Sequence, residues 1–239
     1  MHVKPFLTGE WRNLLMANYE VDPASLKRFL PAHTEPDTFN GKHYASLVGF
    51  LFTNTRVQGW AFPFHKTFEE VNLRFYVRYK ENTVWKRGVV FIKEIVPKMM
   101  ISLVANVFYN EHYVTHRMKH SWTKTEEEIQ VAYYWKIRSE WNFLQVTANL
   151  QAQPIVEGSE EEFITEHYWG YTSIDNNSAG EYEVKHPKWR VHHVNEYKGN
   201  CNIRHLYGSE FVEALTAKPS SVFLAEGSAI EVMKGRKIQ

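Results

Sequence analysis

The alternation of apolar and polar residues is strictest over residues 68–79, which read FEEVNLRFYVRY. Successive side chains of an extended strand point to opposite faces. One face would carry Val71, Leu73, Phe75 and Val77. The other would carry Glu70, Asn72, Arg74 and Tyr76. An acid, an amide, a guanidinium and a phenol in one row can orient a small polar ligand. A solvent-facing or ion-paired strand is the simpler interpretation of the same pattern, so the pattern locates a candidate site without identifying its ligand.

Most other segments also favour extended structure. Strand-like patterns recur over residues 11–19, 42–53, 85–95, 113–124, 128–139, 143–150, 168–174 and 182–194. Residues 221–233 are expected to form a closing strand, or a hairpin with Gly227 at its tip. Short helices are expected after Asp22-Pro23 and over residues 98–108 and 208–215. Residues 160–167 either begin a short helix or lead straight into the strand over residues 168–174. Many short strands and few helices predict a mainly antiparallel α+β protein, built as a β-barrel or sandwich with a few packed helices.

Composition narrows the classes of partner. The chain has 239 residues, of which 44% are hydrophobic, enough for a sizeable core. Lys plus Arg (28) nearly balances Asp plus Glu (27), so no nucleic-acid partner is expected. The most apolar run, residues 99–109, is about half a bilayer span, so no membrane segment is expected. A single cysteine, Cys201, and a start without a signal-peptide pattern predict a cytoplasmic protein.

Motifs for metals and cofactors are weak. His112, His116 and His120 are spaced by four residues, which on a helix would bring three imidazoles to one face. The segment favours a strand, however, in which residues four apart are about 13 Å apart. Glycine-rich phosphate loops and a GxSxG motif are absent from the sequence. We therefore expect neither a metal nor a cofactor.

Six segments of the chain carry a resemblance to a known family. They read WRNLLMANYEVDPASLKRFLP, DTFNGKHYASLVGFLF, FEEVNLRFYV, EFITEHYWGY, VKHPKWRVHHV and SVFLAEGSAIEV. In this order they resemble the YqjF-like DUF2071 family (COG2071) of uncharacterised bacterial proteins. The resemblance spans almost the whole chain, so it implies one domain over residues 1–239. It also implies the fold of acetoacetate decarboxylase, a bent β-barrel around a central cavity with helices packed outside.

The same resemblance indicates which catalytic residues of acetoacetate decarboxylase this chain lacks. Acetoacetate decarboxylase forms a Schiff base through a lysine whose pKa is lowered by a second lysine. Aligned through the segment VDPASLKRFLP, Arg12 falls where the decarboxylase has a pocket arginine, and Glu70 falls near one of its two pocket glutamates. Where the lysine pair is expected, residues 108–112 read FYNEH. The resemblance therefore implies a retained cavity without the Schiff-base mechanism.

These observations lead to one hypothesis and two alternatives. We expect a protein that binds a small organic acid or carbonyl compound in an interior cavity, with Glu70 as the candidate catalytic base. The candidate ligand-binding residues are Arg12, Asn72, Arg74, Tyr76, Tyr109, His112 and His167. One alternative is a lyase or hydrolase that uses a relocated lysine or an acid–base pair. The other is a structural or partner-binding protein whose cavity is filled, and the sequence does not fix the oligomeric state.

Overall fold

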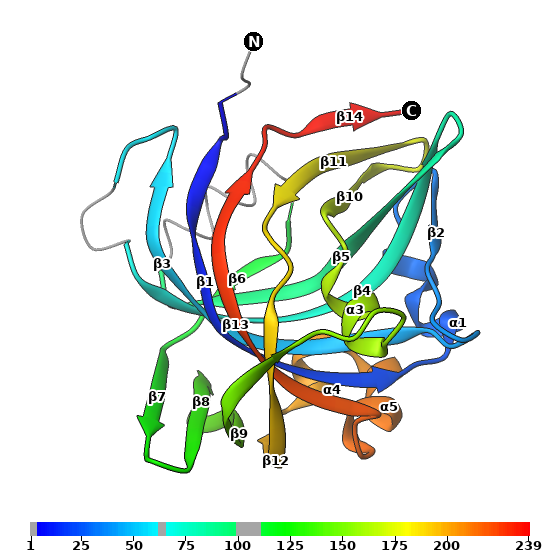
Figure 1. The fold of residues 1–239 in the computed structure, drawn as a ribbon. Helices are drawn as coiled ribbons and strands as arrows, with labels where there is room; N and C mark the ends of the chain where they lie inside the picture. Colours follow the sequence, from blue (N-terminus) through cyan, green and yellow to red (C-terminus); the bar gives the residue numbers. More distant parts are fainter. Residues whose placement is uncertain (1–3, 62–65, 99–110) are drawn as a thin grey trace.

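The computed structural model describes residues 4–61, 66–98 and 111–239, and strands dominate them (Figure 1). The strands are β1 (Leu7–Glu20), β2 (Thr34–Pro36), β3 (Tyr44–Val57), β4 (Phe68–Glu81), β5 (Val84–Val96), β6 (Tyr113–Thr115), β7 (Met118–Lys124), β8 (Glu128–Ile137), β9 (Glu140–Pro154), β10 (Trp169–Asp175), β11 (Ser178–Lys185), β12 (Arg190–Asn200), β13 (Ser221–Val232) and β14 (Arg236–Ile238). The helices are α1 (Pro23–Leu26), α3 (Glu160–Thr165), α4 (Ile203–Tyr207) and α5 (Val212–Thr216), with 3₁₀ turns at Lys27–Phe29 and Ser209–Phe211. In this part of the chain, no helix combines the length and apolar character needed to cross a membrane. The helix expected at residues 98–108 lies outside the described residues, apart from Lys98.

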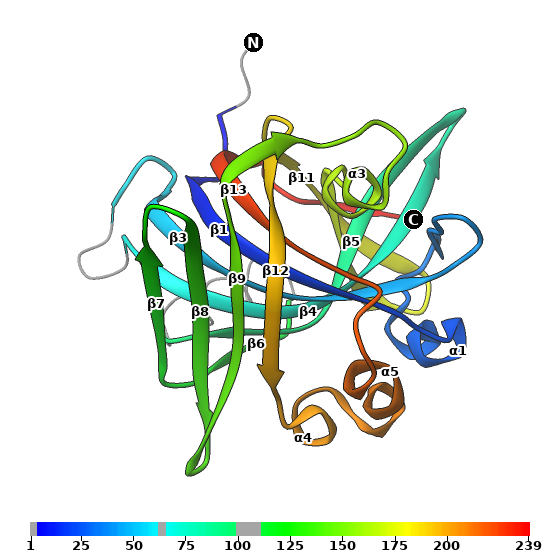
Figure 2. The same ribbon diagram turned by 60° about the horizontal axis from the view of Figure 1, so that its bottom comes forward.

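Part of the sheet closes on itself. Strands β10, β5, β4, β3, β1, β13 and β11 follow one another as hydrogen-bonded neighbours, and β11 pairs in turn with β10. All these pairings are antiparallel except the short parallel contact between β10 and β5. Beyond β13 the sheet continues through β12, β9, β8 and β7. Figure 2 shows these four strands lying across the outside of the ring. The mainly antiparallel class expected from the sequence is confirmed.

The two faces of β4 belong to two different cores. Val71, Leu73, Phe75 and Val77 pack outside the ring with apolar residues of β8 and β9. Tyr76 packs inside the ring. The predicted alternation is therefore confirmed, but the face of Glu70, Asn72 and Arg74 is buried. The interpretation of β4 as a solvent-facing strand is wrong, because the ring turns this face inward.

Bulges interrupt the alternation in β1 and β5. In β1, Asn13 has a positive φ of 54° and the pairing with β3 slips between Arg12 and Leu15. Trp11 and Leu14 consequently line the interior although they are three residues apart. The pairing of β5 with β4 slips in the same way, and Phe91 and Glu94 both line the interior. Each bulge brings a side chain inward that a strict period of two would place outside.

Two sequence-based expectations are corrected, and for residues 221–233 the strand is confirmed over the hairpin. Residues 182–194 form the end of β11 and the start of β12, separated by a segment containing Pro187, which lacks the N–H that a continuous ladder needs. Residues 113–124 divide into β6 and β7. Gly227 lies within the continuous strand β13, opposite Arg12, with φ of 76°. It marks an irregular strand position instead of a hairpin tip.

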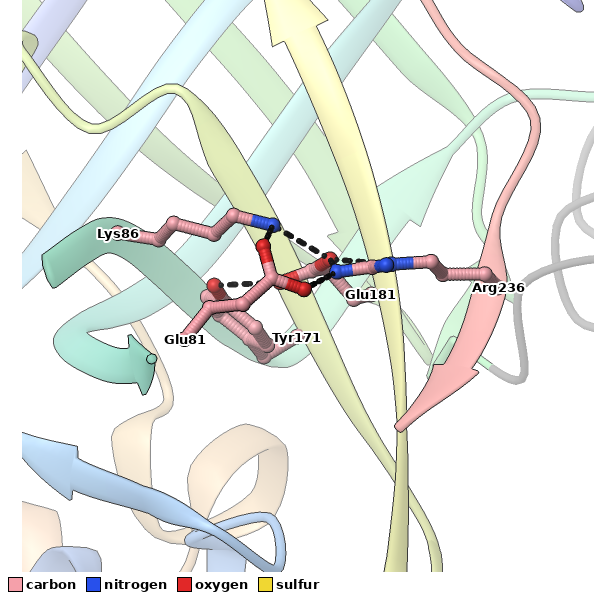
Figure 3. A network of polar contacts seen from close by, with 5 residues as sticks. All are labelled: Glu81, Lys86, Tyr171, Glu181 and Arg236. Atoms are coloured by element: carbon pink, nitrogen blue, oxygen red, sulfur yellow. Dashed lines mark hydrogen bonds and ion pairs between the residues drawn. The ribbon is translucent and has the colours of Figure 1, made fainter. Parts of the chain in front are cut away.

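A polar network centred on the buried Glu181 joins the strands at the closing edge of the ring (Figure 3). The carboxylate of Glu181 on β11 is fully buried and accepts a hydrogen bond of 3.0 Å from the hydroxyl of Tyr171 on β10. Lys86 Nζ lies 3.1 Å from Glu181 Oε1, and Arg236 Nη2 lies 2.7 Å from the same atom. Glu81 also pairs with both cations. The network joins the β4–β5 hairpin, β10, β11 and β14 where the ring has few ladder hydrogen bonds.

Candidate functional site

The ring encloses a cavity of about 460 Å³. Every strand of the ring contributes to its wall, and one contribution from each is Trp11, Phe50, Glu70, Phe91, Trp169, Tyr182 and Val232. The volume lies in the range of cavities that hold small organic ligands. The lining is mostly apolar and aromatic, with polar groups concentrated on β4, β5 and the residues next to them.

The polar wall is built by cross-strand neighbours. Asn72 on β4 is paired in register with Glu94 on β5, and Glu94 is paired with Tyr113 on β6. Asn72 Nδ2 donates a hydrogen bond of 2.9 Å to Glu70 Oε1, and the Tyr113 hydroxyl donates one of 3.3 Å to Glu70 Oε2. Glu111 precedes β6 and accepts a hydrogen bond of 2.7 Å from the Tyr182 hydroxyl. The wall therefore brings three carboxyl groups into one buried patch.

These three carboxyl groups bind protons more tightly than usual. Burial raises the pKa of Glu70 to about 7, against the opposing effects of its hydrogen bonds and of Arg74. Burial also raises the pKa of Glu111 to about 8. The pKa of Glu94 lies well above its ordinary value because of burial and of the nearby charges of Glu111 and Glu70. A large fraction of this patch is therefore protonated at neutral pH.

Arg74 is the cation of the polar wall. Its residue is 8% exposed and lines the cavity beside Asn72. Nη2 donates a long hydrogen bond of 3.4 Å to the Ile164 carbonyl, and Nε has no hydrogen-bond partner within the described residues. None of the ion pairs formed by the described residues includes Arg74 or Glu70. The alternative of a buried ion pair between Glu70 and an arginine is therefore not realised.

His167 lines the cavity as a neutral imidazole at pH 7. Its Nε2 lies 3.1 Å from Asp37 Oδ2, and burial lowers the pKa of His167 to about 4. Burial opposes ionisation of Asp37, but hydrogen bonds from His167 and Arg87 outweigh it and lower the pKa of Asp37 to about 2. At neutral pH a neutral imidazole must donate from Nε2 to this carboxylate. The proton-free Nδ1 has no hydrogen-bond partner among the described residues.

Replacing Asp37, the buried carboxylate hydrogen-bonded to His167, is expected to destabilise the fold in a pH-dependent way. Because the folded pKa of Asp37 lies below its ordinary 3.8, its contribution is present above about pH 4 and is lost as the pH falls through about 2. Asp37→Asn should therefore lower the free energy of unfolding by about 2 kcal/mol at pH 7. Urea unfolding measures this, with the exposed Glu126→Gln as the matched control. An equal loss at pH 7 and pH 2.5 would contradict the assignment.

The structure brings together some of the residues expected from the sequence and separates others. Glu70, Asn72, Arg74 and His167 all line the cavity. Tyr76 lies on the same face but outside the lining, and its hydroxyl is 2.5 Å from Ser46 Oγ in the core. His112 is exposed and does not line the cavity, and Tyr109 lies outside the described residues.

Arg12 lies outside the cavity, contrary to the expectation from the resemblance. Its side chain is 45% exposed, and Nη2 is 2.7 Å from Glu10 Oε2. The neighbouring Trp11 points into the ring, so the next residue along the strand points outward. The guanidinium of the cavity comes from Arg74 instead.

Several polar lining residues were not expected from the sequence, and those that build the carboxyl patch are Glu94, Glu111, Tyr113 and Tyr182. The available signal for Glu94 was one acid within the apolar run VVFIKEIV. No lysine is among the described lining residues, and residues 1–3, 62–65 and 99–110 contain no lysine in the sequence. The polar groups of the cavity therefore include carboxyl groups, phenols, imidazoles, the Asn72 amide and one guanidinium.

Several solved protein structures share this fold. The enduracididine biosynthesis enzyme MppR, complexed with pyruvate, matches 100% of this chain and 92% of its own, with a TM-score of 0.69 and 13% identity. Acetoacetate decarboxylase from Legionella pneumophila subsp. pneumophila str. Philadelphia 1 matches 99% of this chain and 88% of its own, with a TM-score of 0.66 and 13% identity. The fold is that of the acetoacetate decarboxylase-like proteins.

The sequence of the chain also matches one particular family. Residues 8–229 match the profile of DUF2071, described as "Uncharacterized conserved protein (COG2071)", and the chain belongs to this family. A relative, the uncharacterized protein YqjF of Bacillus subtilis (strain 168), is 29% identical over 181 residues, which cover 75% of this chain and 72% of the relative. The resemblance inferred from the sequence is confirmed.

Proposed function

We propose that this protein binds a small organic acid or carbonyl compound in the ring cavity, with Arg74 as the anchor for a carboxylate. The observation that carries the proposal is a buried guanidinium that lines the cavity with its Nε unpartnered among the described residues. A buried cation without an anionic partner is costly. A ligand carboxylate can accept two parallel hydrogen bonds from a guanidinium and so compensate this charge.

The comparisons support the proposal at the level of the fold. One solved protein of the class is complexed with pyruvate, which is both a carboxylate and a ketone. At 13% identity this likeness supports an interior ligand site and carries no residue roles. The open volume of about 460 Å³ favours a ligand over the alternative of a filled interior.

Binding in this way is tested by replacing one arginine at a time. Short carboxylates and carbonyl compounds would be screened by thermal shift and then by calorimetry. We expect Arg74→Gln to weaken carboxylate binding by about 10- to 100-fold, because it removes charge-assisted hydrogen bonds worth about 1.5–3 kcal/mol. Arg12→Gln is the matched control, since Arg12 is exposed and outside the cavity. Equal losses in the two variants, or no binding across the panel, would refute the proposal.

A second candidate function is acid–base catalysis at the carbonyl compound. The observation that favours it is the pKa of Glu70, which burial raises to about 7, so that Glu70 can exchange a proton near neutral pH. A carboxylate that accepts a proton from the carbon next to a ketone would exchange that hydrogen for deuterium. NMR of a bound ketoacid in D₂O tests this, with exchange expected for wild type and lost in Glu70→Gln. Equal exchange rates in wild type and Glu70→Gln would contradict acid–base catalysis by Glu70. Ligand binding would then remain as the proposed function.

A further inference from the structure

The polar wall carries an excess of acidic groups. Glu70, Glu94 and Glu111 face the cavity, each less than 9% exposed. Arg74 is the only lysine or arginine among the described lining residues, and residues 1–3, 62–65 and 99–110 add neither residue type in the sequence. With all three carboxyl groups ionised, the wall would have two negative charges in excess. Such a wall must either hold protons or receive a cation.

Two neighbouring acceptors of this wall also lack donors. Within the described part of the chain, Glu94 Oε2 and Asn72 Oδ1 are buried and have no hydrogen-bond partner. Glu94 is 1% exposed and Asn72 is 2% exposed. The two residues are cross-strand neighbours in register on β5 and β4. Buried acceptors are rarely left without a donor. A protonated Glu94 supplies one donor to this pair, and a ligand with several N–H groups would satisfy both acceptors when Glu94 is ionised.

We infer that the ligand carries a protonated nitrogen in addition to its carboxylate, and that this nitrogen binds against Glu94 and Asn72. The ligand class is then that of amino acids and other small ampholytes. An ammonium group has three donors and no acceptor, which suits a patch made of acceptors. The inference rests on the proposed function, because Arg74 still anchors the carboxylate. Asn72 and Arg74 are two residues apart on one strand face, about 7 Å along β4, so both ends of a small ampholyte can be held.

The opposite side of the cavity is apolar and determines which uncharged part of a ligand can be accommodated. Strands β1 and β13 lie across the ring from β5. The apolar lining residues that they and β3 contribute include Leu7, Trp11, Leu14, Phe50, Phe52 and Val232. This wall can pack against an apolar part of the ligand. Among the described lining residues of these three strands there is no charged side chain to pair with a charged group. Probes for the site should therefore combine the two charged groups with an apolar body.

The test compares ampholytes with molecules that lack one charged group. One set is phenylalanine, 3-phenylpropionate and phenethylamine, and the other is 6-aminohexanoate, hexanoate and hexylamine. The sets differ in the spacing of the two charges. By calorimetry at pH 7, we expect at least one ampholyte to bind about 10-fold tighter than the acid of its set.

Proton exchange on binding provides a second readout, obtained from calorimetry in buffers of different ionisation enthalpy. A bound ammonium favours the ionised carboxyl groups, so an ampholyte is expected to release protons, whereas a plain acid is expected to take them up. The other charged or titratable residues among the described lining residues are Arg74, Tyr113, His167, Tyr182 and His186. Arg74 is a permanent cation. Burial lowers the pKa of both imidazoles to about 4 and raises the pKa of Tyr113 well above its ordinary value, so these groups hold one protonation state near pH 7.

Two variants assign the contacts. Glu94→Gln is expected to reduce the preference for the ampholyte to below about 3-fold and to abolish proton release, while Glu126→Gln, on the surface, should change neither. Acids that bind as well as both ampholytes, with proton uptake, would overturn this inference and leave the carboxylate proposal standing. Amines that bind as tightly as the ampholytes, without help from Arg74, would overturn the carboxylate proposal. No binding in either set would overturn both.

Discussion

Raising the pH from about 6 to about 9 is expected to lower the free energy of unfolding by about 4 kcal/mol through Glu70 and Glu111 alone. Their folded pKa values, about 7 and about 8, lie above the ordinary 4.5 because both carboxyl groups are buried. Between these limits the folded protein holds more protons than the unfolded chain. Stability must therefore fall as the pH rises, and the loss should end once the pH exceeds the folded pKa values. Glu94, whose pKa is raised in the same direction, adds to the loss.

Urea unfolding across this pH range measures the effect. Glu111→Gln is expected to flatten the profile, because a neutral amide has no proton to lose, and to be more stable than wild type at pH 9. The exposed Glu126→Gln should reproduce the wild-type profile. A wild-type protein that is equally stable at pH 6 and pH 9 would show that the three carboxyl groups are ionised in the fold at both pH values. The same experiment with a bound ampholyte should show a smaller alkaline loss if that ligand compensates them.

Gly227→Ala is expected to destabilise the protein by about 3 kcal/mol or more. Gly227 has φ of 76°, and a Cβ at this position would collide with the Trp11 carbonyl oxygen and lie 2.7 Å from Leu14 Cδ1. The backbone of β1 cannot move away easily, because it is paired with both β13 and β3. Since Trp11 and Leu14 line the cavity, ligand binding should weaken together with stability.

Gly41→Ala is the matched control for this substitution. Gly41 has nearly the same φ, 77°, but a Cβ there would meet no atom within 4 Å. It isolates the backbone cost of a positive φ, which is about 1–2 kcal/mol. Chemical unfolding of both variants should therefore show a clearly larger loss for Gly227→Ala. Similar losses would mean that β1 and β13 separate without cost at this point.

The sequence was most informative where local pattern and tertiary environment agree. The alternation in residues 68–79 predicted a strand with two different faces, and β4 has one face in each core. The six sequence segments that resemble the DUF2071 family indicated the acetoacetate decarboxylase-like fold. Three of the four residues on the face of Glu70, Asn72, Arg74 and Tyr76 line the cavity, and their role as a binding site stays a prediction. A single domain over residues 1–239 and a cytoplasmic location stay predictions.

Other features depend on contacts between distant segments. A polar row on a strand does not show whether it faces water, and only closure of the ring through β10 and β11 buried it. The phase of a strand is lost at a bulge, so an alternating pattern could not bring Phe91 and Glu94 to one face or show that Arg12 points outward. Glu111 and Tyr182, 71 residues apart, meet only through the tertiary fold. The sequence by itself therefore determined the strand, its two faces and the family, while the tertiary structure decided which charges share the cavity, because burial and proximity arise only when the sheet closes.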